Sequence, residues 1–324
     1  MSCSPFLING RQFTALLPLI NELEFTAAKN YLFDLSYLSS LAVSGEKASD
    51  FLQGQLSCDL RQVNSNTIRQ GAMCNLKGRV LALMDVVDWQ GLQLVLPKDL
   101  IAATQFSLNK TAMLSRVKLE IKDSYQIYGF YLANPDDLLP ENLPLPSQDL
   151  ALSTNEQACC YSLGKQLFII LIKQDYAAAL AQPFESKQQL RGSLAWHRLQ
   201  LQAKTVEIYP DTRGLFLPHR IDLQLSGYLS FDKGCYKGQE IVARTHYRAK
   251  LKHRLDLFII ESAEAIQAGK KLFATTGGNT EVGELIDYCP LANKSYLIAA
   301  SVLLDAPKEV LIEGQAEPVL LSTI

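Results

Sequence analysis

Apolar and polar positions near the start of the chain follow first a strand-like and then a helical pattern. The run Leu41-Ala-Val43 is typical of a strand that ends at Ser44-Gly45. From Glu46 to Leu56 the apolar residues recur close to helical spacing, which predicts a helix with Ser44 as its N-cap. Residues 31–57 therefore read as strand, turn and helix.

The next third of the chain has the pattern of a hairpin followed by a helix and further strands. Strands at 71–75 and 80–87 flank a turn at Leu76-Lys77-Gly78-Arg79, and another strand follows at 92–96. We expect a helix at 98–114 and strands near 116–122 and 126–132. Residues 133–149 hold four prolines and four acidic residues, so they are expected to form an exposed connection. Residues 175–204 are expected to be largely helical.

The pattern changes after about residue 250. Short alternating or apolar runs, separated by Gly, Asn and Pro, occur at 255–260, 271–275, 281–288, 296–303 and 310–313. Such a series predicts a small antiparallel β-barrel at the C-terminal end. The overall expectation is an α+β protein with two regions, 1–250 and 251–324.

Composition and charge exclude several classes of protein. The net charge of −2 creates no global field toward nucleic acid or membrane, so direct nucleic-acid binding is not expected unless a local patch supplies it. The apolar runs are too short to span a bilayer and the N-terminus lacks a signal-peptide pattern, so we expect a soluble, cytoplasmic protein. The seven cysteines form no CxxC pair and the four histidines no HxxxH pattern, so no metal site is expected.

One segment carries the strongest chemical signal: Lys233-Gly-Cys-Tyr-Lys-Gly-Gln-Glu240. Gly234 and Gly238 leave the backbone bare on both sides of Cys235, which permits tight turns and close approach of a ligand. The flanking lysines and the N–H groups of a helix starting here would favour the thiolate. Composition alone leaves two interpretations open: a reactive thiol, or a small residue buried in a glycine-rich turn.

A basic stretch follows directly at residues 244–254, with five Lys or Arg, two His and no acidic residue. If residues 248–254 are extended, Arg248, Lys250, Lys252 and Arg254 share one face. That face would suit an anion such as a glutamate tail, a phosphate or an RNA backbone. An edge strand protected by charge is the alternative.

These motifs together resemble the YgfZ family of folate-binding proteins, which are distant relatives of the glycine-cleavage T-protein aminomethyltransferases. The resemblance spans most of residues 38–254. It rests on four blocks of sequence in order: Val43-Ser-Gly45 with Phe51-Leu-Gln-Gly-Gln-Leu-Ser-Cys-Asp59, the Lys77-Gly78-Arg79 turn, the segment from Trp196 to Phe216-Leu-Pro-His-Arg220, and the hallmark Lys233, Gly234, Cys235, Tyr236, Gly238, Gln239 and Glu240 with Val242-Ala-Arg244.

The resemblance implies a multi-lobed, T-protein-like fold around a central folate site, ending in a β-barrel. It implies tetrahydrofolate or a derivative as the ligand. It also implies a role in assembling or repairing iron–sulfur clusters in enzymes that modify tRNA, with those enzymes as partners. On this basis the folate-binding residues are Trp196, Leu38, Gln202, Arg244 and Arg248, and Cys235 is the thiol of the site.

The sequence departs from the family pattern at three positions. The two ligand-stacking tryptophans of the family correspond to Leu38 and Trp196, so one aromatic platform is lost. The T-protein glutamate that binds the pterin corresponds to Gln202, which cannot accept two N–H groups as a carboxylate does. The catalytic aspartate of the T-protein corresponds to Ala82.

These departures leave the enzyme question open. A folate-binding accessory protein is the leading hypothesis. The alternatives are a tetrahydrofolate-dependent aminomethyltransferase or demethylase, against which Ala82 counts, and an RNA-binding protein that uses the basic 244–254 stretch.

Overall fold

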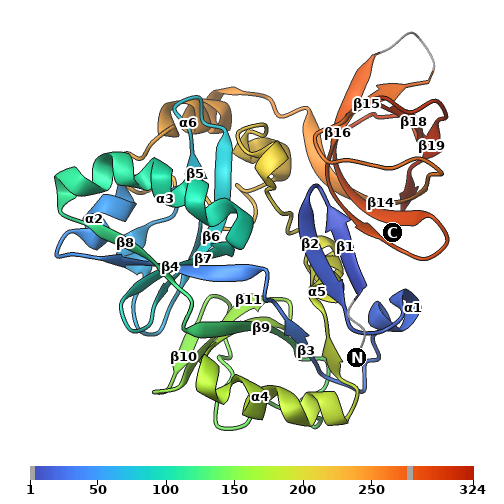
Figure 1. The fold of residues 1–324 in the computed structure, drawn as a ribbon. Helices are drawn as coiled ribbons and strands as arrows, with labels where there is room; N and C mark the ends of the chain where they lie inside the picture. Colours follow the sequence, from blue (N-terminus) through green and yellow to red (C-terminus); the bar gives the residue numbers. More distant parts are fainter. Residues whose placement is uncertain (1–3, 276–279) are drawn as a thin grey trace.

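The computed structural model describes residues 4–275 and 280–324, and the strands in that part of the chain form four sheets. Three lobes surround a central N-terminal hairpin and helix α5, as Figure 1 shows. One lobe carries α2, α3, α6 and β4 to β8, the second β3, β9 to β12 and α4, and the third the C-terminal strands. The expected α+β, multi-lobed architecture is confirmed.

The first lobe is built on a five-stranded antiparallel sheet in the order β5-β6-β7-β4-β8. Its strands are β4 (Leu38–Ser44), β5 (Arg69–Cys74), β6 (Val80–Asp88), β7 (Leu92–Pro97) and β8 (Lys118–Lys122). Helix α3 (Lys98–Ala112) covers the sheet through Leu100, Ile101, Thr104 and Leu108, which are buried at helical spacing. The hairpin, the helix and the strands expected between residues 71 and 132 are therefore confirmed.

The second lobe contains a six-stranded sheet in the order β10-β11-β12-β9-β3-β13. Its strands are β3 (Tyr31–Asp34), β9 (Tyr125–Tyr131), β10 (Leu152–Thr154), β11 (Ala158–Gly164), β12 (Leu167–Lys173) and β13 (Leu190–Arg191). Helix α4 (Gln174–Ser186) packs on one face of this sheet. The other face contributes Ile127, Cys159 and Tyr161 to the main core.

The C-terminal lobe is a nearly closed antiparallel barrel of seven strands within the described residues, in the order β19-β18-β15-β16-β17-β14-β20. Its strands are β14 (His253–Glu261), β15 (Lys271–Ala274), β16 (Glu281–Pro290), β17 (Ser295–Leu303), β18 (Glu309–Ile312), β19 (Val319–Leu320) and β20 (Ser322–Thr323). The expected C-terminal barrel is confirmed, and the division at residue 250 stays a prediction.

Polar contacts connect the first lobe and the barrel through the N-terminal hairpin, which is formed by β1 (Ser4–Ile8) and β2 (Arg11–Ala15). The buried Arg11 guanidinium binds Asp99 at the start of α3 and Glu207 in the loop after α5 (Ser193–Gln202). Asp287 of β16 accepts hydrogen bonds from the Glu207 N–H at 2.8 Å and from the Tyr209 hydroxyl at 2.6 Å. These charge-assisted contacts hold the first lobe and the barrel against the hairpin and the loop after α5.

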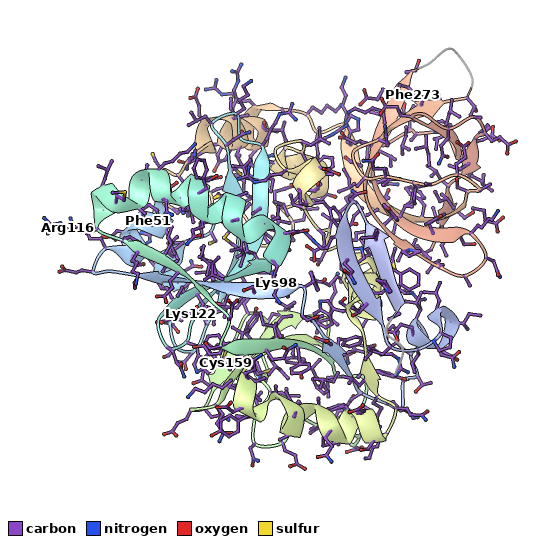
Figure 2. The ribbon with its side chains drawn as sticks, in the orientation of Figure 1. Phe51, Lys98, Arg116, Lys122, Cys159 and Phe273 are labelled. Atoms are coloured by element: carbon purple, nitrogen blue, oxygen red, sulfur yellow. The ribbon has the colours of Figure 1, made fainter. Side chains whose placement is uncertain are left out.

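The remaining elements are short. Helix α1 spans Leu19–Glu22, α2 Ala48–Gln53 and α6 Gln239–Arg248, and short 3-10 helices lie at Leu60–Gln62, Met113–Ser115, Pro210–Thr212 and Pro218–Ile221. Residues 133–149 form the connection that the sequence predicts. In the described part of the chain, no helix is long and apolar enough to cross a membrane. The labelled side chains of Figure 2 help to locate the lobes: Phe51 and Lys122 in the first, Cys159 in the second and Phe273 in the barrel.

Three sequence predictions about local structure are wrong. The helix expected over 46–56 is shorter, because Gly54 caps it and Leu56 forms a bridge to Met73 of β5. Ser44 is not its N-cap, since it is the last residue of β4 and pairs with Lys118. The 248–254 stretch is not one extended segment: α6 continues to Arg248 and β14 begins only at His253.

A candidate folate cavity and the thiol motif

A cavity lies where the five-stranded sheet, the six-stranded sheet and α5 meet. Its inner part has a volume of about 50 Å³, and its outer part has a volume of about 430 Å³. The two parts are adjacent, because both are lined by Gln70, Leu163, Gln200, Thr205 and Tyr228. The outer part is in the size range of small-molecule sites in proteins, whereas the inner part is smaller.

The wall of the inner part is mostly apolar and comes from both sheets. Leu38 of β4, Leu83 of β6, Val95 of β7, Leu163 of β11 and Ile169 of β12 all line it. Branched aliphatic side chains on two facing sheets offer a flat heterocycle contact on both of its faces. A site of this kind gains most of its affinity from burial and its orientation from a few polar groups.

Asp85 of β6 is the most distinctive polar group of the cavity. The Tyr161 hydroxyl donates to its Oδ2 at 2.9 Å, and the Gln70 side-chain amide donates to its Oδ1 at 3.0 Å. Burial raises the pKa of Asp85 to about 6, although both donors favour the ionised form. Among the described residues Asp85 has no salt bridge, so its carboxylate is available to a ligand that donates hydrogen bonds.

Gln200 of α5 offers a second acceptor. Its side-chain Oε1 is buried and has no hydrogen-bond partner within the described protein, while the residue lines both parts of the cavity. A buried acceptor without a partner is costly, which indicates that a ligand or water donates to it. Glu207, also in the wall, already accepts hydrogen bonds from the Arg11 guanidinium and from the Tyr37 hydroxyl, each at 2.9 Å.

Two lysines lie at the mouth of the cavity. Lys165 donates to the Ala203 carbonyl at 2.6 Å, and Lys204 donates to the Leu255 carbonyl at 2.9 Å and to Asp256 at 3.1 Å. Both line the outer part. Asp149 and Asp222 also line the outer part, so the mouth carries charged groups of both signs.

The thiol motif lies elsewhere, against the helix α2 region, and Lys233 holds it there. The Lys233 ammonium is 7% exposed and donates to three carbonyls, those of Gln53 at 2.8 Å, Leu56 at 2.6 Å and Cys58 at 2.6 Å. Burial lowers the pKa of Lys233 to about 8, so the side chain is still protonated at neutral pH. This lysine therefore joins two of the motif blocks that lie about 180 residues apart.

Gly238 brings a third block to the same place. Its φ of +86° and its close approach to the 75–79 turn both require glycine, since an added Cβ would lie 2.4 Å from the Asn75 carbonyl oxygen. Gly78 faces it across the same contact. The family-like blocks at 51–59, 77–79 and 233–240 thus form one structural unit around α6.

Cys235 is the exposed thiol of this unit. Among the six described cysteines it alone is exposed, whereas burial raises the pKa of Cys58 to about 11 and that of Cys74 to about 12. Helix α6 begins only at Gln239, and Cys235 is not among the residues that line the central cavity. The thiol and the cavity are therefore two separate features of the molecule.

The residues predicted to bind folate do not all meet at the cavity. Leu38 lines it. Trp196 lies on α5 but is 0% exposed and packs against Gly129, where an added Cβ would fall 2.5 Å from its ring. Gln202 is exposed and lies outside both parts of the cavity, two residues after Gln200 on the same helix.

Arg244 and Arg248 are exposed on α6 and line a separate surface groove. Ala82 is fully buried and lines neither part of the central cavity. The sequence prediction missed Asp85, Gln200 and the two lysines at the mouth. One signal for Asp85 was present, because it is the only charged residue within the apolar run from Val80 to Val87.

Comparisons with known proteins agree with this architecture. No protein-family model matches the chain. A tRNA-modifying protein YgfZ of Colwellia psychrerythraea is 25% identical over 297 residues, which cover 90% of this chain and 91% of the relative. The YgfZ protein of Hamiltonella defensa is 28% identical over 66% of each chain, and that of Escherichia coli 26% over 73% and 74%.

A solved structure gives the same answer for the fold. The glycine cleavage system aminomethyltransferase T of Bartonella henselae superposes with a TM-score of 0.68 over 99% of this chain and 92% of its own, at 18% identity. The resemblance that the motifs indicate is therefore confirmed, and the fold is that of aminomethyltransferase T.

Proposed function

For a chain of the YgfZ type with the aminomethyltransferase T fold, we propose the function of a folate-binding accessory protein in tRNA modification. The observation that carries the folate part is the central cavity, where the Asp85 carboxylate and the Gln200 side-chain oxygen are acceptors on an otherwise apolar wall. The tRNA part rests on the similarity to proteins named as tRNA-modifying.

The chemistry of the cavity suits a reduced pterin. One edge of a pterin presents a ring N–H beside an amino group, and a carboxylate accepts from such a pair in a bidentate way. In the proposal Asp85 takes that role, Gln200 accepts a further N–H, and Leu38 and Leu83 contact the ring. The anionic glutamate tail would leave through the mouth, near Lys165 and Lys204.

The role of the pterin carboxylate thus moves from the Gln202 position to Asp85. A carboxylate is a stronger acceptor than an amide, and hydrogen bonds to charged groups contribute about 1.5–3 kcal/mol each. Asp85 therefore removes the objection that an amide at residue 202 weakens pterin binding. Folate supplies one-carbon units when it is bound, and this chain's own contribution is to bind and orient it.

Aminomethyl transfer is not part of the proposal. In the T-protein pattern the catalytic aspartate corresponds to Ala82, which is buried away from the cavity. Asp85 lies three residues further along the same strand, within the wall. If a one-carbon transferase activity exists, Asp85 is the carboxylate that would serve it, and a turnover assay with tetrahydrofolate and an aminomethyl donor tests this second candidate.

The finer part of the proposal concerns iron–sulfur clusters. By its resemblance, the protein would support the assembly or repair of clusters in enzymes that modify tRNA, with the exposed Cys235 as the group that meets the client. Cys235→Ala is expected to fold and to bind folate like the wild type but to fail to complement a strain that lacks its own YgfZ protein. Full complementation would remove Cys235 from the function.

Calorimetric titration with tetrahydrofolate and folinic acid tests the folate part. We expect a dissociation constant of about 1 µM, which corresponds to about 8 kcal/mol. Asp85→Asn should weaken binding roughly tenfold to a hundredfold, because a charge-assisted contact is lost. Asp88→Asn removes the same charge from the same strand outside the cavity and should leave the affinity unchanged. Wild-type protein that binds neither folate would refute the proposal.

A further inference from the structure

The surface of α6 carries cations that the protein does not pair. Arg244, Arg248, Lys250 and Lys252 are all exposed, and none of them forms a salt bridge within the described residues. Arg244 and Arg248 are four residues apart on one helix, so they lie on the same face. The two lysines follow in the segment that leads to β14.

Aromatic rings stand beside these cations. Phe231 and His246 stack with ring centroids 3.8 Å apart and planes 17° from parallel. Tyr247 meets His246 at 4.9 Å and Phe231 at 5.9 Å, nearly perpendicular to both. Tyr247 is nonetheless 69% exposed. The protein thus holds a large ring in solvent, with an orientation fixed by two neighbours.

A groove runs along this surface. It is lined by Arg244, Arg248, Tyr247, Ala243 and Glu240, and its free space is about 970 Å³, some of it open to solvent. None of its residues lines the central cavity. The groove is therefore a site of its own, and Glu240 is its single acidic group.

The combination of groups decides between classes of anionic partner. Cations alone would suit a phosphate, an acidic peptide or an anionic membrane equally well. An exposed, oriented aromatic ring adds a surface on which a base can stack, and stacking contributes about 1–3 kcal/mol per base. Bases are free to stack on a protein only where they are unpaired, which favours a single strand over a duplex.

We propose that the α6 groove binds an unpaired stretch of RNA, with a base stacked on Tyr247 and backbone phosphates on Arg244, Arg248, Lys250 and Lys252. The choice of RNA over other polynucleotides rests on the proposed function in tRNA modification. The near-neutral net charge predicts no direct nucleic-acid binding, but α6 and the segment after it carry four exposed cations without a salt bridge among the described residues, and binding depends on that local field.

Fluorescence anisotropy with a labelled oligouridine of about 12 nucleotides tests the proposal. Three or four phosphate contacts give a slope of about −2 to −3 in a plot of log affinity against log salt, since each contact contributes about −0.7 for a single strand. Affinity should then fall about 20- to 50-fold between about 50 mM and about 200 mM salt. No measurable binding at the lower salt concentration would overturn the proposal.

Variants separate stacking from charge. Arg244→Glu/Arg248→Glu should weaken oligouridine binding at least tenfold. Tyr247→Ala, which changes no charge, should weaken it about fivefold or more. Because all three side chains are exposed, both variants should keep the wild-type circular dichroism spectrum and melting temperature. Unchanged affinity in the tyrosine variant would refute the stacking surface.

A matched control reverses two exposed cations on another part of the surface. Lys29→Glu/Lys187→Glu makes the same change in net charge as the arginine variant, and neither lysine forms a salt bridge in the described chain. Its affinity for oligouridine should stay within about twofold of the wild type. An equal loss in both double variants, or tighter binding to a duplex or to polyglutamate than to oligouridine, would overturn the proposal.

Failure of this inference is distinguishable from failure of the proposed function. The α6 variants should bind folinic acid like the wild type, because the groove and the central cavity share no residue. Asp85→Asn should in turn bind oligouridine like the wild type. Loss of both ligands in either variant would contradict two independent sites.

Discussion

Protonation of Asp85 should control folate affinity. The carboxyl has a pKa of about 6 in the free protein, because burial in the cavity wall outweighs its hydrogen bonds from Tyr161 and Gln70. If the ionised form accepts from the pterin edge, the ligand binds only the deprotonated protein tightly. Affinity must then fall as the pH falls through about 6.

The size of the effect follows from the pKa. At about pH 7.5 nearly all Asp85 is ionised, whereas at about pH 5 only about a tenth is. Folinic acid should therefore bind about tenfold more weakly at pH 5, a loss of about 1.4 kcal/mol. Isothermal titration calorimetry at half-unit pH steps measures this profile.

Asp85→Asn is the control that isolates the residue. It keeps the shape of the side chain but cannot titrate, so any remaining pH dependence belongs to the ligand or to other groups. The ratio of wild-type to variant affinity should shrink about tenfold from pH 7.5 to pH 5. A ratio that stays constant, or that grows toward acid pH, would refute the carboxylate as the acceptor.

Three further perturbations test the structure itself. The folded state holds the Asp85 proton more tightly than the unfolded chain, so the Asp85 contribution to the free energy of unfolding should fall by about 2.4 kcal/mol as pH rises from about 4 to 7. The difference between urea unfolding of the wild type and of Asp85→Asn measures this contribution, and a difference that does not change with pH would contradict the raised pKa. Lys233→Met removes the donor that hydrogen-bonds to three carbonyls and should lower the free energy of unfolding, measured in urea, by about 3 kcal/mol or more. A change below about 1 kcal/mol would contradict a stabilising role of these hydrogen bonds. Gly238→Ala should lower the melting temperature strongly, whereas Gly234→Ala, with no atom within 4 Å of its added Cβ, should not; equal melting temperatures would show that the contact with the 75–79 turn is dispensable.

The sequence predicted most elements of the fold because their patterns are local. The hairpin over residues 71–96 and the helix that starts near residue 98 follow from alternation and helical spacing. The helix expected over 46–56 was too long because tertiary contacts override its pattern. Lys233 donates hydrogen bonds to the carbonyls of Gln53, the last residue of α2, and of Leu56, which lies beyond the helix.

The residues of the site were harder to predict, because they depend on which side chains of two sheets face the cavity between them. Alignment to a family pattern placed the pterin group at residue 202, but the helix turns residue 200 into the cavity and leaves 202 in solvent. The same alignment predicted that Trp196 stacks on the ligand. In the structure its ring packs inside the core instead, where Gly129 leaves room for it. Asp85 does not correspond to a residue of the family motifs. The sequence therefore indicated it only through its position as a charged residue within an apolar strand.

The Lys233 motif shows the opposite case. The sequence analysis singled out its eight residues, but it left open whether Cys235 is reactive and did not anticipate the structural roles of the neighbouring residues. Lys233 and Gly238 are fixed by contacts with residues more than 150 positions away, which no local pattern reveals. The motif thus connects segments that are distant in the sequence and also carries an exposed thiol.

A crystal structure of the protein with folinic acid tests the folate-binding proposal most directly. We predict the pterin in the central cavity, with its ring N–H and amino group at about 2.7–3.2 Å from the Asp85 carboxylate oxygens and the glutamate tail directed toward Lys165 and Lys204. A folate bound only in the α6 groove, or in the central cavity with its pterin edge turned away from Asp85, would contradict the proposed recognition.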